Sequence, residues 1–367
     1  MSGMRGISRG LAAFAALALA GVAAADVSVF LRGSGDSLRV ESAFGDMRGL
    51  EVRDAKGATI LPWDTVRAVE GQTGTAGIGD YLAMGADLWR ARIRIERGDP
   101  ALAQPLLAKH WSRLRDADGP TSALAAEGLL RCALDANDVR AAADPWLACL
   151  RHRSAGVSSR FAELPAVIDA ETGLLAELSP FLPEARRKDV VAACEASKAL
   201  GESGDVAARI VRIAKGVGAA AAASSDAETK DAPRSKAASA SSRAVLALAH
   251  VEDIASARDA RALERSIAAF DKDFDEPPSF LGAWKLAAIG TARARMAREV
   301  QGDARAAALS RAALQLLAVP AAGLDKTGLV DAYALEEAAK LLRESGDAAS
   351  AAQLDALVTE KTSGDRT

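Results

Sequence analysis

The spacing of apolar residues divides the chain near residue 75. Up to Gly71, short apolar stretches alternate in part with polar residues and are separated by turn sequences such as GSGD at 33–36. A period of two is typical of strands that bury one face. From Ile78 onward, apolar residues recur at spacings of three and four, the period of an amphipathic helix. We therefore expect a mainly α protein that begins with a small β module over residues 26–72.

Four or five short strands fit within the β module. Their sequences are VSVFL at 27–31, LRV at 38–40, LEV at 50–52, TIL at 59–61 and VRAV at 66–69. Strands this short and close together predict a small barrel or curled sheet. The stretch from Ile60 to Val66 resembles the last strands of small SH3-like or Sm-like barrels. Such a barrel could bind a peptide or a surface glycan, but we favour a module that caps or docks onto the helical part.

A recurring pair of residues marks the expected turns between helices. Glycine or asparagine followed by aspartate occurs at 98–99, 137–138, 204–205, 302–303 and 346–347. Glycine can take the left-handed conformation that ends a helix, and aspartate can cap the next helix. In four places an alanine stands five residues after the glycine or asparagine: Ala103, Ala142, Ala307 and Ala351. A small residue lets the second helix approach the first, so we expect tight helical hairpins.

This repeated turn resembles that of tetratricopeptide repeats, in which two helices meet at a Gly-Asp turn followed by a small residue. Ala91 and Ala339 also match that family's small residue midway along the first helix. The turns are unevenly spaced, and Pro105 and Pro145 fall where they should kink or restart a helix. The resemblance implies an α-solenoid of degenerate, TPR-like helical hairpins.

Two interruptions divide the helical part. Residues 161–183 contain several prolines among apolar residues, which predicts an ordered loop packed along the solenoid. Residues 216–242 are alanine, serine and mixed charge without aromatic residues, which predicts a disordered linker. We therefore expect one helical-repeat half at 78–215 and a second at 243–360.

The first 25 residues have the pattern of a secretory signal peptide. Arg5 and Arg9 precede the apolar run Leu11–Ala20, and three alanines end at Ala25. This run is shorter than a bilayer-spanning helix, so we expect cleavage after Ala25 and no membrane span in the mature protein. The expected location is the periplasm or the medium.

The composition of the chain limits the classes of molecule that it is expected to bind. Without residues 1–25 the chain has 44 Lys and Arg against 49 Asp and Glu, a formal charge of 44 − 49 = −5. An acidic chain has no electrostatic footprint for nucleic acid. Alanine is abundant and aromatic residues make up only 4% of the chain, which favours closely packed helices.

The three cysteines are expected to be small buried residues rather than disulfide partners. Cys132 and Cys149 lie about five and twelve residues from the turn near residue 137. On antiparallel helices this difference is an offset of roughly 10 Å, beyond the reach of a disulfide. Cys194 would in any case remain unpaired.

Residues with catalytic potential are scattered. His110, His152 and His250 form no metal-binding pair, and His152, between Arg151 and Arg153, is expected at the surface. Neither a phosphate-binding loop nor a nucleophile elbow occurs. The sequence thus predicts no cofactor, and a site built from scattered carboxylates such as Asp169 and Glu171 stays an alternative.

The acidic string DKDFDE at 271–276 has oxygen ligands at alternate positions, as calcium sites do. Glu276 stands where the helix-loop-helix calcium motif needs glycine, and Gly282 stands where it needs glutamate. We favour a solvated acidic loop, with calcium as the alternative.

Arginines provide the best candidate for partner binding. Arg90, Arg94 and Arg97 share one face of the first expected helix, and Arg293 and Arg295, with Arg298, mark a similar helix in the second half. The tetratricopeptide resemblance implies that such helices line a concave surface, where guanidinium groups could bind carboxylates. Solvated polar faces produce the same spacing.

The sequence as a whole predicts an exported, non-enzymatic scaffold that binds another exported or envelope protein through a helical-repeat groove. One alternative is a factor in envelope assembly or polysaccharide binding that uses the β module. The other is an enzyme with a carboxylate-based site.

Overall fold

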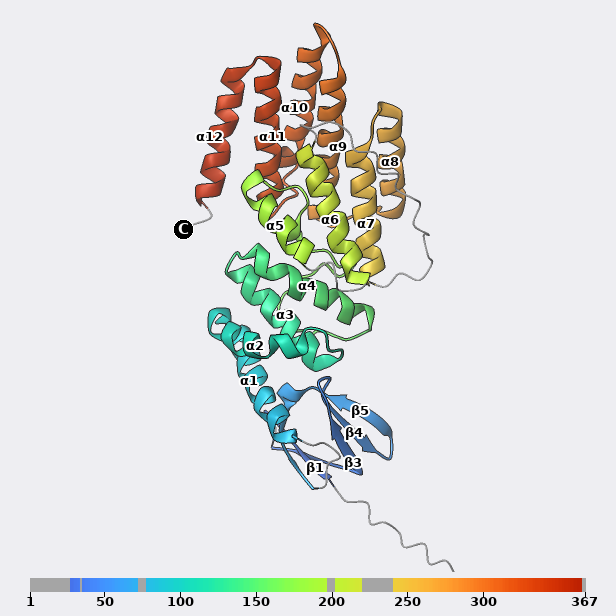
Figure 1. Cartoon of the computed structure of the whole chain (residues 1–367), viewed down its shortest axis with the longest axis vertical. Coiled ribbons are helices and arrows are strands. Elements are labelled where there is room, and N and C mark those ends of the chain that lie inside the picture. The colour runs from blue at the N-terminus through green and yellow to red at the C-terminus, as the bar shows by residue number, and fades with distance from the viewer. Residues whose placement is uncertain (1–26, 34, 72–76, 197–201, 220–239, 365–367) are drawn as a thin grey trace, which may run out of the picture.

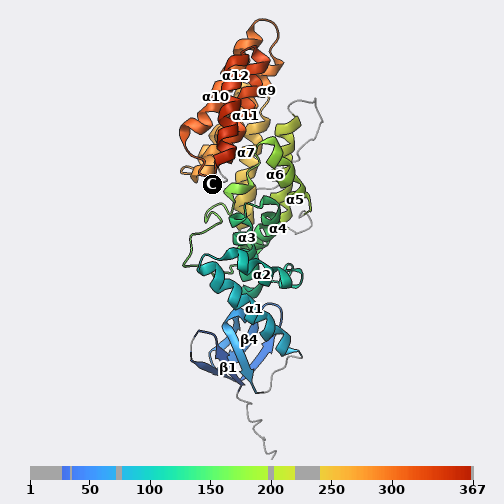
Figure 2. The same ribbon diagram turned by 90° about the vertical axis from the view of Figure 1, so that its left-hand side faces the viewer.

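The computed structural model describes residues 27–33, 35–71, 77–196, 202–219 and 240–364. These residues form a small β region followed by a long series of paired helices (Figure 1). Helices account for 66% of the structure, which confirms the mainly α prediction. The β region lies at one end of the long axis, and the last helices lie side by side at the other end (Figure 2).

Two predicted segments fall largely outside the described residues. The signal peptide at 1–25 lies entirely outside them. Of the predicted linker at 216–242 the structure describes only the ends, and these are helical: residues 216–219 close one helix and residues 240–242 open the next.

Six strands and one 3-10 turn make up the described β region. They are β1 (Val27–Leu31), β2 (Ser37–Val40), β3 (Ser42–Gly45), β4 (Leu50–Asp54), β5 (Gly57–Leu61), the turn η1 (Trp63–Thr65) and β6 (Val66–Glu70). Two antiparallel sheets result, one with the order β2-β1-β6 and the other with the order β3-β4-β5. All five predicted strands are present, and β3 is an additional one.

The predicted barrel is wrong, because the two sheets do not close on each other. The chain leaves the first sheet and enters the second at Glu41, whose N–H donates to the Arg53 carbonyl (2.8 Å). A helix, α1 (Ile78–Glu96), completes the core instead of a closing strand, since Trp63 of the β region shares one buried cluster with Leu88 of α1.

Trp63 fastens the β region to the helices. Its side chain is fully buried and stacks on Tyr81 of α1, with ring centroids 5.1 Å apart. The indole Nε1–H donates to the Asp46 carbonyl (2.7 Å), and the main-chain N–H donates to Thr121 Oγ1 (3.1 Å). A tryptophan in this position buries a large apolar surface while its polar groups stay hydrogen-bonded. The β region therefore docks onto the helical part.

The remaining helices pack mainly on their neighbours in sequence. They are α2 (Pro100–Leu114), α3 (Pro120–Asp135), α4 (Val139–Ser154), α5 (Glu184–Ala196), α6 (Glu202–Ala219), α7 (Ala240–Ser256), α8 (Ala260–Asp273), α9 (Ser279–Glu299), α10 (Ala304–Ala322), α11 (Leu329–Ser345) and α12 (Ala348–Gly364). Helix α7 also packs on α9, so α8 stands beside the series rather than within it.

Four of the five predicted turns join consecutive helices: 98–99, 137–138, 302–303 and 346–347. Their first residues all have positive φ, including Asn137 at 53°. Of the four alanines predicted to lie against the first helix, Ala307 is exposed and the others are buried. The fifth predicted turn is wrong, since residues 204–205 lie in the first turn of α6.

The predicted restart of a helix at Pro105 and Pro145 is also wrong. Both prolines lie inside helices that continue to Leu114 and Ser154. Proline lacks the N–H that would bond to the carbonyl four residues earlier, so each helix loses one intrahelical hydrogen bond there and still continues.

Residues 155–183, called the connecting segment below, link α4 to α5 and contact α11. Phe161, Leu175 and Phe181 are almost completely buried, which confirms the predicted ordered, packed loop. The ring of Phe181 contacts that of Tyr333 on α11 at 5.5 Å between centroids. Buried residues from α4 to α11 belong to one continuous hydrophobic cluster that includes this segment.

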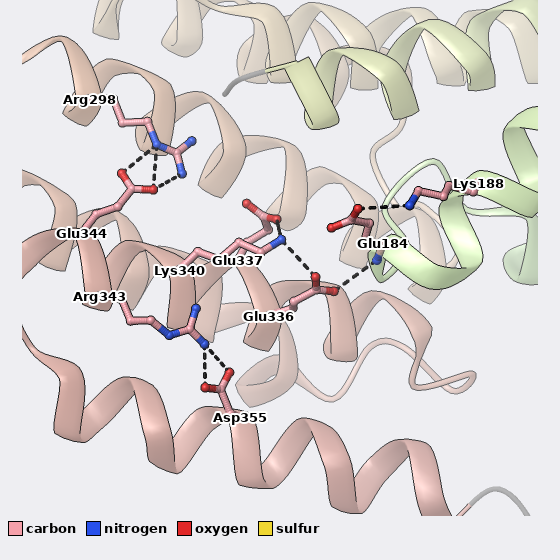
Figure 3. A network of polar contacts seen from close by, with 9 residues as sticks. All are labelled: Glu184, Lys188, Arg298, Glu336, Glu337, Lys340, Arg343, Glu344 and Asp355. Atoms are coloured by element: carbon pink, nitrogen blue, oxygen red, sulfur yellow. Dashed lines mark hydrogen bonds and ion pairs between the residues drawn. The ribbon is translucent and has the colours of Figure 1, made fainter. Parts of the chain in front are cut away.

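A polar network reinforces the same junction (Figure 3). The main-chain N–H of Glu184, at the start of α5, donates to the Glu336 carboxylate on α11 (3.2 Å). Lys340 bridges Glu336 (3.0 Å) and Glu337 (2.8 Å). Arg298 on α9 makes a bidentate pair with Glu344. These contacts link α5, α9 and α11, which are distant in sequence.

A substitution at Gly85 on α1 tests how closely the β region packs against the helices. A Cβ at this position would lie 2.3 Å from the Trp63 carbonyl oxygen, whereas a Cβ at Gly79 would meet nothing within 4 Å. We expect Gly85→Ala to lower the free energy of unfolding by about 1–2 kcal/mol, because the clash outweighs the better helix propensity of alanine. Urea denaturation measures this change.

The matched control is Gly79→Ala in the same helix, which we expect to raise the free energy of unfolding by up to about 1 kcal/mol. Equal stability of the two variants would contradict the close contact between α1 and Trp63.

Candidate functional site

A cleft of about 470 Å³ opens between α3, α4 and the connecting segment. One wall is apolar and comes from Phe161, Leu164, Val167 and Ile168. The opposite side carries the polar groups Glu127, Arg131, His152 and Arg153, together with the Cys149 thiol. Its size and mostly apolar lining are those of a small-molecule pocket.

Arg131 is held in place from three directions. It forms an ion pair with Glu127 (2.8 Å), donates to the Pro165 carbonyl (3.0 Å), and lies 5.2 Å from the ring centroid of Phe161. Its charge is therefore matched by a carboxylate inside the cleft.

Arg153 has different partners. Its two terminal nitrogens donate to the carbonyls of Asp169 (3.0 Å) and Ala170 (2.9 Å) in the connecting segment. These carbonyls are neutral, and within the described ranges no carboxylate lies at ion-pair distance from the Arg153 guanidinium. The charges that line the cleft thus sum to +1: two arginines and one glutamate.

His152 lines the cleft and is buried, so its predicted surface position is wrong. Its Nε2 lies 2.9 Å from Ser122 Oγ, which itself donates to the Leu114 carbonyl (2.6 Å). Because the serine proton is used there, His152 donates from Nε2 and Nδ1 carries the lone pair. Burial and, less strongly, Arg151 lower the pKa of His152 to about 4.

This serine and histidine do not have the properties of a nucleophile and its base. Ser122 is fully buried and its proton bonds a main-chain carbonyl. His152 Nδ1 has no hydrogen-bond partner in the described structure, whereas a catalytic base is oriented by a third group. The pair is a structural link between α3 and α4.

The three cysteines are buried and none of them forms a disulfide within the described residues, as the sequence predicts. Burial raises the pKa of the Cys149 thiol far above its usual range, and it raises that of Cys132 to about 11. Both are therefore uncharged thiols at neutral pH and poor nucleophiles.

The far end of the cleft wall is anchored to the β region. Arg160 in the connecting segment reaches Asp64 in η1 (3.2 Å), and Arg92 on α1 approaches the same carboxylate oxygen (3.0 Å). Asp64 is fully buried, and burial raises the pKa of its carboxyl while the two guanidinium groups partly offset that effect. The wall is therefore fixed to two other parts of the fold.

The predicted binding arginines lie elsewhere. On α1, Arg90 pairs with Asp87 (3.5 Å), Arg94 donates to the Leu102 carbonyl (2.6 Å), and Arg97 is an exposed residue at the helix end. On α9, Arg293 donates to Gln315 and Arg295 donates to the Ala255 carbonyl (2.5 Å). Helices α1 and α9 are far apart along the long axis, so the two sets do not share one surface (Figure 1).

The carboxylates singled out as an alternative catalytic site have structural partners. Asp169 accepts from the N–H and hydroxyl of Thr172 (both 2.7 Å), and Glu171 pairs with Arg243 (2.5 Å). These contacts shape the connecting segment and join it to α7.

Residues of the acidic string at 271–276 also have partners within the protein. Asp271 pairs with Lys285 (2.5 Å), and Asp273 lies 2.8 Å from Nε2 of His250. Within the part of the chain that the structure describes, no group of three or more potential ligands is placed to hold a metal ion.

Comparisons of the chain with family models, with curated proteins and with solved structures found no match. Across the described residues, no helix is both long and apolar enough to cross a membrane.

The buried imidazole gives a pH prediction. The pKa of His152 is about 4 in the folded protein and about 6.5 in an unfolded chain, so the unfolded chain binds this proton more readily. Its contribution to stability is complete above pH 6.5 and is lost as the pH falls toward 4. We expect a loss of up to about 3 kcal/mol over this range.

Urea denaturation of the wild type and of His152→Phe between pH 4 and pH 7 measures the effect. At pH 7 the variant is less stable because it loses the bond to Ser122, but its stability should fall less steeply on acidification. If the free energies of unfolding of the two proteins fell in parallel with pH, the lowered pKa of His152 would be contradicted.

Proposed function

We propose that this protein is an exported, non-enzymatic scaffold that binds another protein of the cell envelope or the medium. The observation that carries the proposal is the serial packing of α1 to α12, joined by buried side chains that run from α4 to α11 without a break. Such an array presents a long surface on a fixed framework, as repeat proteins do when they bind partners. The pattern of the first 25 residues supports export.

A relationship to tetratricopeptide repeats is part of this proposal. Its support is the two hairpins α1/α2 and α3/α4, each closed by a glycine or asparagine with positive φ and each with a buried alanine in the second helix. Helices α11 and α12 repeat the arrangement at the other end of the chain.

The arginines of α1 are the first surface to test. Arg90 and Arg97 are exposed, and their positive charge suits an acidic partner. The triple variant Arg90→Gln, Arg94→Gln and Arg97→Gln should reduce capture of the partner at least about fivefold, since several charged contacts disappear together. The measurement is quantitative mass spectrometry of proteins cross-linked to the mature chain in envelope extract, with glycans analysed in parallel.

The matched control is the triple variant Arg258→Gln, Arg261→Gln and Arg265→Gln, which removes three exposed arginines of similar spacing at α8. Equal capture by both triple variants and the wild type would contradict binding through α1. Recovery of glycan in place of protein would favour a polysaccharide-binding factor and overturn the scaffold proposal.

A further inference from the structure

The cleft beside the connecting segment has the geometry of a ligand site distinct from any long docking surface. Its volume of about 470 Å³ falls in the range of pockets that enclose small organic molecules. The walls come from two helices and a segment that is anchored at Asp64, so the cleft is already formed without a ligand. A preformed pocket spares a ligand the cost of ordering its walls.

The cleft selects the polarity of its occupant. Leu164, Val167 and Phe161 offer apolar contact, whereas the polar groups gather on the side of α3 and α4. A molecule with an apolar body and one polar end would satisfy both sides. Burial of the apolar body against these side chains supplies the main favourable term.

The charge of the polar end follows from the arginines. Glu127 already neutralises Arg131, while Arg153 donates to two neutral carbonyls and keeps further N–H donors on its guanidinium. His152 lines the cleft as a neutral imidazole and adds no charge. A single negative charge balances the net +1 of the cleft, whereas a doubly charged phosphate would be repelled by Glu127.

We propose that this cleft binds a small amphipathic carboxylic acid, with its carboxylate on Arg153 and its apolar body along Phe161, Leu164 and Val167. This activity is additional to the scaffold role, because it concerns a small molecule in the cleft rather than a protein on the outer surface of the helices.

The test measures binding of octanoate to the mature protein by isothermal titration calorimetry, with octanamide as the probe of equal shape and no charge. We expect octanoate to bind at least about tenfold more tightly than octanamide, because a charge-assisted hydrogen bond is lost with the amide. Octyl phosphate, which carries a second negative charge, should bind more weakly than octanoate.

Two variants locate the binding. Arg153→Gln should weaken octanoate at least about tenfold and leave octanamide nearly unchanged. Because Arg153 also holds the connecting segment, a second variant leaves that contact intact: Ala123→Leu fills the cleft from α3 and should weaken octanoate and octanamide alike. Arg261→Gln, at an exposed position on α8 outside the cleft, is the charge-matched control and should bind as the wild type does.

Several outcomes would overturn the proposal: no heat of binding with octanoate at millimolar concentration, equal affinity for octanoate and octanamide, or unchanged affinity in Ala123→Leu. If Arg153→Gln lowers the melting temperature, the affinity of Ala123→Leu for octanoate decides whether the ligand binds in the cleft. Partner capture by the α1 surface is measured separately, so either proposal can fail without the other.

Discussion

The connecting segment has to bury large apolar side chains without a long helix to satisfy its backbone, and the rest of the structure depends on how it does so. Asp169 and Thr172 accept several of its N–H groups, and the indole of Trp146 donates to the Gly173 carbonyl (3.1 Å). With its polar groups paired, the segment can carry Phe161 and Phe181 into the core. It thereby joins the β region, the first helices and the last helices.

Burial with paired polar groups also describes several of the potentially reactive side chains. A chain with few aromatic residues packs its helices through alanine, and several of the polar side chains buried between the helices have a defined partner. His250 lies near Asp273 and two phenylalanine rings, and the Cys132 thiol donates to the Pro100 carbonyl (3.3 Å). Burial keeps the Cys132 and Cys149 thiols uncharged, so these side chains contribute to packing.

Local signals in the sequence were sufficient for much of the fold and for little of the candidate site. Apolar periodicity and the Gly-Asp turns predict most helices, since both reflect interactions within a few residues. Strand β3, with the sequence SAFG, contains only one residue of a type that marks strands, Phe44, and pairs with β4. His152 has polar neighbours in sequence, and only the packing of α3 on α4 turns it inward. The cleft needs residues 123 to 170 to come together, which no short pattern encodes.

Hydrogen exchange of the connecting segment, followed by mass spectrometry in native buffer, tests the central claim most directly. If this segment is the ordered joint of the molecule, peptides that cover residues 169–181 should exchange as slowly as those of α4 and α11, because their N–H groups open only when the shared core opens. Exchange of these peptides within seconds, while α4 and α11 stay protected, would contradict the account.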